Sequence, residues 1–503
     1  MKKTLITLLL IIASCMYSHA ELMVVDGIQY LFWPFDDNDT CAVYKLHGNH
    51  VDIIIPEEVE LKSKAYNTVK KYKVTWIYSG AFENSEITSI TLPNTLRGIG
   101  SNAFKNVKSL NSIDIPKSVT QIGDGAFAFS GIKAIEIPKN VTSIGNETFQ
   151  GTAITTIKLS DNITTIGSDA FNSCAYLETV QLSSNLHSIG SGAFWNCVSL
   201  VSIEIPDKVK SIGNMAFQNC VALQSVNFGK GLRSIGSTAF AYCTSLDGIV
   251  IPDNTKKIGS SSFFGSGLKT LDTGNGLKNI PNSAFFGCDS LARVNIGNSV
   301  DSIMPMAFYM CDTLQEITIP ENVKMIGNDA FYSCRQLKSV LNGEGVDSIG
   351  NGAFRDCKCL RWVELGSKLR KVHHNAFEDS KNIKVIVSHI QNPEDVIVYL
   401  GGSSDTLYVP HGTRDRYIAI EAWSHYYVDI YKSIYPTYDD YSKSYGARQI
   451  IEGEPTSGIV PITKGVVGEK EYYDMQGRRN NSFKRGLNIV RMSDGRIKKV
   501  IYK

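Results

Sequence analysis

A phenylalanine recurs every 22 or 23 residues through most of this chain, and other apolar positions repeat in register with it. Self-similarity at such a period is typical of a solenoid, in which each unit has an apolar face that only a neighbouring unit can cover. The pattern therefore predicts about fourteen stacked coils of mainly β structure. The repeat phenylalanines are Phe82, Phe104, Phe127, Phe149, Phe171, Phe194, Phe217, Phe240, Phe263, Phe285, Phe308, Phe331, Phe354 and Phe377.

The segment 200–220, LVSIEIPDKVKSIGNMAFQNC, shows how one coil is built. Ile203 and Ile205 flank Glu204, which predicts a short strand with both isoleucines facing inward and the glutamate facing out. Pro206 lacks an N–H and closes that strand. A second short extended piece and a turn that carries the phenylalanine complete the coil.

Ten coils place a glycine directly after the isoleucine of the second extended piece. The other four coils have Tyr78, Pro281, Met304 or His373 there. Because proline cannot adopt a positive φ angle, this position does not require one in every coil. The glycine is expected to relieve close packing between coils, unless the corner changes shape at those four sites.

The N-terminus predicts export. Met1 to Ala20 has two lysines, a mainly apolar run and a small-x-small site, which together are typical of a secretory signal cleaved after Ala20. An alternative is lipidation of Cys15, because residues 12–15 resemble a bacterial lipobox. No other stretch is apolar and long enough to suggest a membrane span.

Export raises the question of disulfides, since the chain has eleven cysteines. Other coils have small residues at the position that most of these cysteines share, so the position is expected to select for size, and the cysteines to be buried and unpaired. Cys41 and Cys359 stay unassigned. Eight cysteines lie three residues after a repeat phenylalanine: Cys174, Cys197, Cys220, Cys243, Cys288, Cys311, Cys334 and Cys357.

Catalytic and metal-binding patterns are weak. His47 and His50, and the pair at His373, lack a second pair of ligands nearby in sequence, and no phosphate loop or nucleophile motif stands out. The sequence therefore predicts no enzyme, cofactor or metal site; a hydrolase is the most distant alternative. The net charge of +2 gives no support for nucleic-acid binding.

The units TSIGNETF, KSIGNMAFQNC and DSIGNGAFRDC, preceded by strands such as IEIP, resemble BspA-like leucine-rich repeats. The resemblance covers 77–380 and implies a right-handed leucine-rich-repeat solenoid. Residues 21–76 resemble the N-terminal cap and atypical first coils of such proteins, and 381–433 resemble the capping coil at the other end.

Beyond that cap, 434–468 reads as a linker, and 469–503 alternates like short strands joined by turns. This small β-rich tail resembles the C-terminal sorting domains of type IX secretion, which implies delivery to the cell surface.

The family resemblance implies binding to macromolecules as an adhesin. The partners it implies are host extracellular-matrix or cell-surface proteins, acidic glycans, or bacterial surface components. The alternative is a structural spacer or scaffold on the bacterial surface whose faces bind nothing.

Two columns of side chains are candidate binding surfaces. Lys210, Arg233, Lys256 and Lys278 occupy one position in four successive coils, so they predict a line of positive potential that attracts an anionic partner. The alternative is an ordinary solvated face, neutralised by the neighbouring column Asp114, Glu136, Glu204, Asp272 and Glu364.

The second column follows the repeat phenylalanine directly and consists of Trp195, Phe264, Phe286, Tyr309 and Tyr332. Four of the five residues lie in successive coils. This aromatic strip is a candidate for stacking on sugar rings or for anchoring a protein partner. The alternative is packing against the loop of the next coil.

Overall fold

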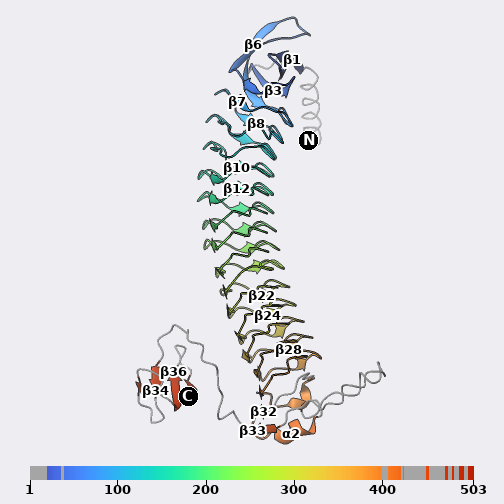
Figure 1. The fold of residues 1–503 in the computed structure, drawn as a ribbon, viewed down its shortest axis with the longest axis vertical. Coiled ribbons are helices and arrows are strands. Elements are labelled where there is room, and N and C mark those ends of the chain that lie inside the picture. Colours follow the sequence, from blue (N-terminus) through green and yellow to red (C-terminus); the bar gives the residue numbers. More distant parts are fainter. Residues whose placement is uncertain are drawn as a thin grey trace, which may run out of the picture.

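The computed structural model describes residues 20–34, 39–341, 343–398, 406–420, 423 and 449–452, and the backbone of four strands between 471 and 502. The predicted signal segment up to residue 19, with Cys15, lies outside the described residues, as does most of the predicted linker. In the described part, the chain forms a long β solenoid, closed at each end by a different structure (Figure 1).

One strand stack runs along the rod and contains the second extended piece of each coil. Its strands pair in parallel, and the isoleucines lie in register, so that Ile212 pairs with Ile189 on one side and Ile235 on the other. The strands are β8 (Gly98–Ile99), β9 (Gln121–Ile122), β10 (Ser143–Ile144), β12 (Thr165–Ile166), β14 (Ser188–Ile189), β16 (Ser211–Ile212), β18 (Ser234–Ile235), β20 (Lys257–Ile258), β22 (Asn279–Ile280), β24 (Ser302–Ile303), β26 (Met325–Ile326), β28 (Ser348–Ile349) and β30 (Lys371–Val372).

The other stack contains the first strands of the coils, which pair in parallel in separate groups. Ile203 and Ile205 are buried and Glu204 is exposed, which confirms the predicted alternation. Its strands are β4 (Asp52–Ile54), β7 (Ser89–Thr91), β11 (Thr156–Lys158), β13 (Thr179–Gln181), β15 (Ser202–Glu204), β17 (Ser225–Asn227), β19 (Gly248–Val250), β21 (Thr270–Asp272), β23 (Arg293–Asn295), β25 (Glu316–Thr318), β27 (Ser339–Leu341), β29 (Trp362–Leu365), β31 (Val385–Ser388), β32 (Thr406–Val409) and β33 (Gln449–Glu452). The groups include β11-β13, β15-β17 and β19-β21-β23, and Ser112 and Ala134 are joined by an isolated parallel bridge.

The repeat phenylalanines form a continuous ladder inside the rod. All fourteen are buried, and successive ring centroids lie 5.1 to 5.6 Å apart with interplanar angles between 1° and 17°. Offset stacking of this kind adds to the large apolar area that each ring buries. The ladder therefore joins every coil to its two neighbours.

The turn around each phenylalanine has an unusual backbone. In all fourteen coils, the residues two before and two after the phenylalanine have positive φ angles, as in Met215 (φ 56°) and Asn219 (φ 60°). This left-handed conformation points the N–H groups of alternate residues at the next coil. Phe217 donates to the carbonyl of Ala239 at 2.8 Å, and its two left-handed neighbours donate in the same way.

The corner glycines have the role predicted from packing. None of the ten has a positive φ angle. At Gly213, an added Cβ would lie 2.5 Å from the carbonyl carbon of Gly190 and 2.5 Å from the backbone nitrogen of Ser191. Glycine is thus favoured at Gly213 because the backbone of the preceding coil occupies the space of a side chain.

The N-terminal end is covered by a mixed sheet in the order β1-β2-β3-β6-β8-β9, with β5 paired to β6. The hairpin between the first two strands turns at Asp26 and Gly27, both at positive φ. This sheet continues directly into the first strand stack through β8. Its remaining strands are β1 (Glu21–Val25), β2 (Ile28–Phe32), β3 (Thr40–Leu46), β5 (Glu58–Lys62) and β6 (Val69–Ile77).

The C-terminal end is closed by a 3-10 helix, η1 (Pro393–Asp395), and a short helix, α2 (Arg414–Ala419). Tyr417 and Trp423 are fully buried and meet edge to face at 4.9 Å. The Tyr417 hydroxyl lies 2.6 Å from the Ser388 hydroxyl and donates to the Ile390 carbonyl at 2.8 Å. No helix in the described ranges could cross a bilayer, since each is too short.

The structure differs from the predicted linker at one place. Gln449–Glu452 form β33, which pairs in parallel with β32 and is the last strand of the second stack. The side chain of Ile450 packs against the core, so these residues belong to the cap.

The tail forms a separate antiparallel sheet in the order β35-β34-β36-β37. Its strands are β34 (Glu471–Tyr473), β35 (Arg479–Asn480), β36 (Gly486–Arg491) and β37 (Ile497–Tyr502).

Candidate binding surfaces

The structure places the four basic residues in one line on the surface. Lys210, Arg233, Lys256 and Lys278 are all exposed, in successive coils next to the start of β16, β18, β20 and β22. The Arg233 N–H donates to the Lys210 carbonyl at 2.9 Å, and the Lys256 N–H donates to the Arg233 carbonyl at 2.8 Å. We call these four residues the basic column. Their spacing is fixed by the hydrogen bonds between coils.

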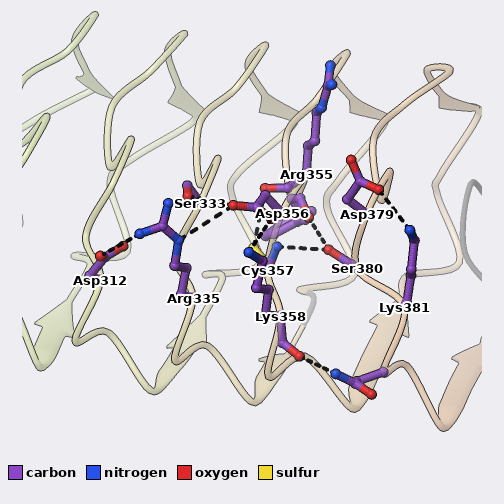
Figure 2. Close-up of polar contacts among 12 residues, drawn as sticks. Asp312, Ser333, Arg335, Arg355, Asp356, Cys357, Lys358, Asp379, Ser380 and Lys381 are labelled. Carbon is purple, nitrogen blue, oxygen red and sulfur yellow. Dashed lines mark hydrogen bonds and ion pairs between the residues drawn. The ribbon is translucent and has the colours of Figure 1, made fainter.

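None of the four cations forms an ion pair within the described part of the chain. A few charged residues elsewhere on the rod do pair between coils. Arg335 lies 3.4 Å from Asp312 and 3.5 Å from Asp356, so it joins three successive coils (Figure 2). The basic column is therefore a line of positive charge on the surface, and the Lys256 ammonium donates to the Asp253 carbonyl at 3.4 Å.

The predicted neutralising column does not reach these cations. Glu204 and Asp272 lie in the other strand stack, in β15 and β21. Asp272 accepts hydrogen bonds from the Gly274 N–H at 2.8 Å and the Asn295 amide at 2.9 Å. The Asp272 carboxylate therefore stabilises the turn that follows β21 and contacts β23 of the next coil.

The aromatic strip forms a surface stack. The centroids of Phe264 and Phe286 are 4.8 Å apart, those of Phe286 and Tyr309 4.5 Å, and those of Tyr309 and Tyr332 4.6 Å, with interplanar angles of 15° or less. All four rings are half-buried. Both earlier interpretations change: each ring packs on the next ring instead of on a loop, and its flat faces are occupied.

A stack of this geometry presents ring edges to solvent. The edges suit contact with an apolar side chain better than stacking on a sugar ring, which needs a free face. At one end, the Arg355 guanidinium lies 5.9 Å from the centre of the Tyr332 ring and pairs with Glu378 at 3.0 Å. Trp195 is exposed but lies three coils before Phe264, so it is not part of the stack.

Three further exposed residues, not predicted from the sequence, lie beside these columns. Lys257 follows Lys256 on the surface, and Met306 and Met310 flank Tyr309. For Lys257, the two adjacent lysines in the sequence indicated a second exposed cation. The methionines could be recognised only once their left-handed backbone, at φ 58° and 57°, was known to turn them outward.

The eight aligned cysteines are buried free thiols, as predicted. The prediction that size alone selects them was incomplete. Each thiol donates to the carbonyl of the repeat phenylalanine in the preceding coil, at sulfur-oxygen distances of 3.0 to 3.3 Å. The Ser380 hydroxyl makes the same bond to Phe354 at 2.7 Å. The position therefore favours a small hydrogen-bond donor.

This burial predicts a simple labelling result. Burial raises the pKa of the Cys243 thiol to about 12, and that of Cys220 well above its ordinary value, so little reactive thiolate forms at neutral pH. Of the described cysteines, only Cys359 is exposed. We expect iodoacetamide to label Cys359 alone in the folded chain from residue 21 onward, and every cysteine after unfolding. Mass spectrometry of peptides would measure this. Disulfide-linked peptides from the ladder would contradict it.

Comparison with known proteins identifies the repeat. A family model described as BspA type Leucine rich repeat region matches in six copies within 75–201, 164–292 and 256–384. A leucine-rich repeat protein from Bacteroides ovatus is 31% identical over 72% of this chain and 99% of its own, with a TM-score of 0.59.

Two other solved structures are more distant. A leucine rich cell surface protein from Faecalibacterium prausnitzii is 26% identical over 64% of this chain and 94% of its own, with a TM-score of 0.44. A leucine-rich repeat protein from Eubacterium ventriosum is 19% identical over 72% of this chain and 95% of its own, with a TM-score of 0.41. A comparison with curated protein sequences finds no match.

Proposed function

Because the chain belongs to the BspA-type leucine-rich repeat family, we propose that it is an exported repeat protein of the bacterial surface that binds macromolecules as an adhesin. The basic column is its main binding surface. Its partner is an extended anionic molecule, either an acidic glycan or the acidic surface of a matrix or cell-surface protein. The aromatic strip is a second contact surface for the same partner.

A single observation carries this proposal. Lys210, Arg233, Lys256 and Lys278 are exposed, aligned in four successive coils and without ion-pair partners in the described residues, whereas Arg335 on the same rod pairs with carboxylates of two neighbouring coils. Rungs in a parallel β stack lie about 4.8 Å apart, so the column extends over roughly 15 Å. A rigid line of cations at that spacing suits a chain with regularly spaced negative groups.

The test is charge reversal on one face of the rod. The variant K210E/R233E/K256E/K278E is measured for binding to acidic glycans, mucins and matrix proteins at low and raised salt. Surface charge pairs contribute about 0.5 kcal/mol each, so loss of four contacts is expected to weaken binding by about 2 kcal/mol, or about thirtyfold. Raised salt should weaken binding of the unaltered protein in the same direction.

The matched control reverses four other exposed lysines, in the variant K117E/K133E/K139E/K158E, with the same change in net charge. Equal loss in both variants would mean that only net charge matters, and would contradict a defined site. If binding is unaffected by salt and by reversal of the basic column, the main binding surface would be the aromatic strip instead.

The competing function is a spacer that binds nothing. It predicts that both charge-reversed variants behave normally, and that removing whole coils impairs surface display of the tail. The tail itself, by its resemblance to sorting domains, is proposed to direct the chain to the cell surface. Export by this route is tested by deleting 469–503 and locating the protein by cell fractionation.

A further inference from the structure

The coils are not all the same length, and the short ones are unevenly distributed. Four phenylalanine-to-phenylalanine intervals are 22 residues instead of 23, beginning at Phe82, Phe127, Phe149 and Phe263. Only the intervals that begin at Phe127 and Phe149 follow one another. This is the one place in the repeat region where two short coils are stacked together.

The missing residue comes from the turn after the phenylalanine. In full coils, the next buried leucine is six positions later, as from Phe171 to Leu177, whereas in short coils the corresponding leucine or isoleucine is five positions later. In the two stacked short coils these residues are Ile132 and Ile154. Two shortened turns, between the full turn of the preceding coil and that of the following coil, leave a hollow on this corner of the rod.

The structure contains a hollow of about 260 Å³ at this place. Its lining includes Lys108 from the full turn before it and Tyr176 from the full turn after it. Small residues from the short coils, among them Gly151 and Ala153, lie between them. The hollow is smaller than the pockets of about 300 to 1,000 Å³ that take drug-sized ligands, so it suits a single ring.

Two aromatic side chains stand at this hollow. Tyr176 is 64% exposed, and Phe129 is 39% exposed with a positive φ angle of 57°. A bulky residue is costly in that conformation, and an exposed ring offsets little of the cost by burial. The ring lies against Gly151 of the next coil, where an added Cβ would be 2.5 Å from the Phe129 Cδ1 atom. Both rings therefore keep exposed surface at the hollow.

Polar groups with unused capacity complete the hollow. The Ser130 hydroxyl is in a side chain only 3% exposed and has no hydrogen-bond partner within the described residues. Buried polar groups normally have a partner, but Ser85, at the same repeat position, is also unpaired, so this feature is not specific to the hollow. Lys108 is exposed and forms no ion pair in the part of the chain that the structure describes.

From these observations we propose that the hollow binds one pyranose ring that carries a carboxylate. The C–H faces of the sugar pack on Phe129 and Tyr176, and the Lys108 ammonium pairs with the carboxylate. Such a ring could be a uronic acid of a polysaccharide or a sialic acid at the end of a glycan. The site lies on a different corner from the basic column, so it extends the proposed function to a second, independent contact.

The test uses the chain from residue 21 onward and free sugars. Glucuronic acid, N-acetylneuraminic acid and glucose are titrated up to about 10 mM and followed by saturation-transfer NMR, since one ring in a shallow site binds weakly. We expect binding of at least one acidic sugar, about tenfold tighter than glucose. Preference for glucuronic acid would indicate a uronic acid of a polysaccharide as the natural ligand. Preference for N-acetylneuraminic acid would indicate a sialic acid at the end of a glycan.

Three variants and a control locate the site. A153F fills the hollow and Y176S removes one ring, so each should abolish binding, while K108Q should remove only the preference for acidic sugars. Y242S, which removes an exposed ring from another coil, should bind normally. Acidic-sugar binding that is unchanged in both A153F and Y176S would overturn the proposal, as would no binding of any sugar.

Ala153 is only part-exposed, so loss of binding in A153F alone can reflect a folding defect. Y176S removes an exposed ring, so loss of binding in that variant does not have this explanation. Equal binding of glucose and the acidic sugars would overturn the role of Lys108. Reversal of the basic column should leave free-sugar binding intact, so failure of that surface and failure of the hollow are distinguishable.

Discussion

Replacing Phe217 with alanine is expected to destabilise the coils from Phe194 to Phe240 by about 4 kcal/mol. The Phe217 ring is fully buried and stacks on Phe194 at 5.2 Å and on Phe240 at 5.1 Å. Its loss leaves a cavity that two rigid strand stacks cannot close. Because long repeat arrays do not unfold in one step, the measurement is amide hydrogen exchange coil by coil.

The distribution of the effect matters as much as its size. Each coil contacts only its neighbours, so exchange near Phe331 and Phe354 should stay unchanged. Tyr242→Ala, at an exposed position in the adjacent coil of Phe240, is the control and should cost less than about 0.5 kcal/mol. Faster exchange along the whole rod in Phe217→Ala would show that the solenoid unfolds as one cooperative unit, contrary to this expectation.

Replacing Gly213 with alanine is expected to cost about 3 kcal/mol, although its φ angle suits alanine. The new methyl group would lie 2.5 Å from backbone atoms of Gly190 and Ser191, which cannot move away without separating two coils. The same exchange measurement should show opening between the coils of Phe194 and Phe217, with little change within either one.

Gly248→Ala is the matched control, because its added Cβ would meet the Thr270 Oγ1 atom at 2.4 Å. A hydroxyl can rotate away where a backbone cannot, so this change should cost about 1 kcal/mol or less. Similar costs for the two alanines would mean that backbone crowding between coils is not what requires the corner glycine.

The sequence predicted the solenoid well because each coil repeats the same apolar positions, so fourteen copies of a weak signal reinforce one another. It also predicted the steric role of the corner glycine from the single observation that Pro281 occupies the same position. It did not predict the two left-handed residues around each phenylalanine. Asn, Asp and Gly are frequent at those positions, which is typical of positive φ angles. Phe129, Met215 and Tyr242 at the same positions make that pattern hard to recognise.

Surface features were harder to predict because they depend on side-chain direction. The alignment of Lys210 to Lys278 followed from the repeat alone. The occupied ring faces of the Phe264-to-Tyr332 stack could not be deduced, because a column of residues does not reveal whether its rings face one another or the solvent. The hollow beside Tyr176 depends on the lengths of neighbouring turns, which the types of residue at the repeat positions do not reveal.

The hydrogen bonds between coils have a mechanical consequence. Those of the turn corner, such as the bond from Phe217 to Ala239, join each coil to the next along the rod. A pull on the two ends would load these bonds in tension and open them one coil at a time. Each opened coil of 22 or 23 residues would release about 75 Å of extended chain. A tether of this design would lengthen stepwise under flow and rewind on the coil that remains beside it.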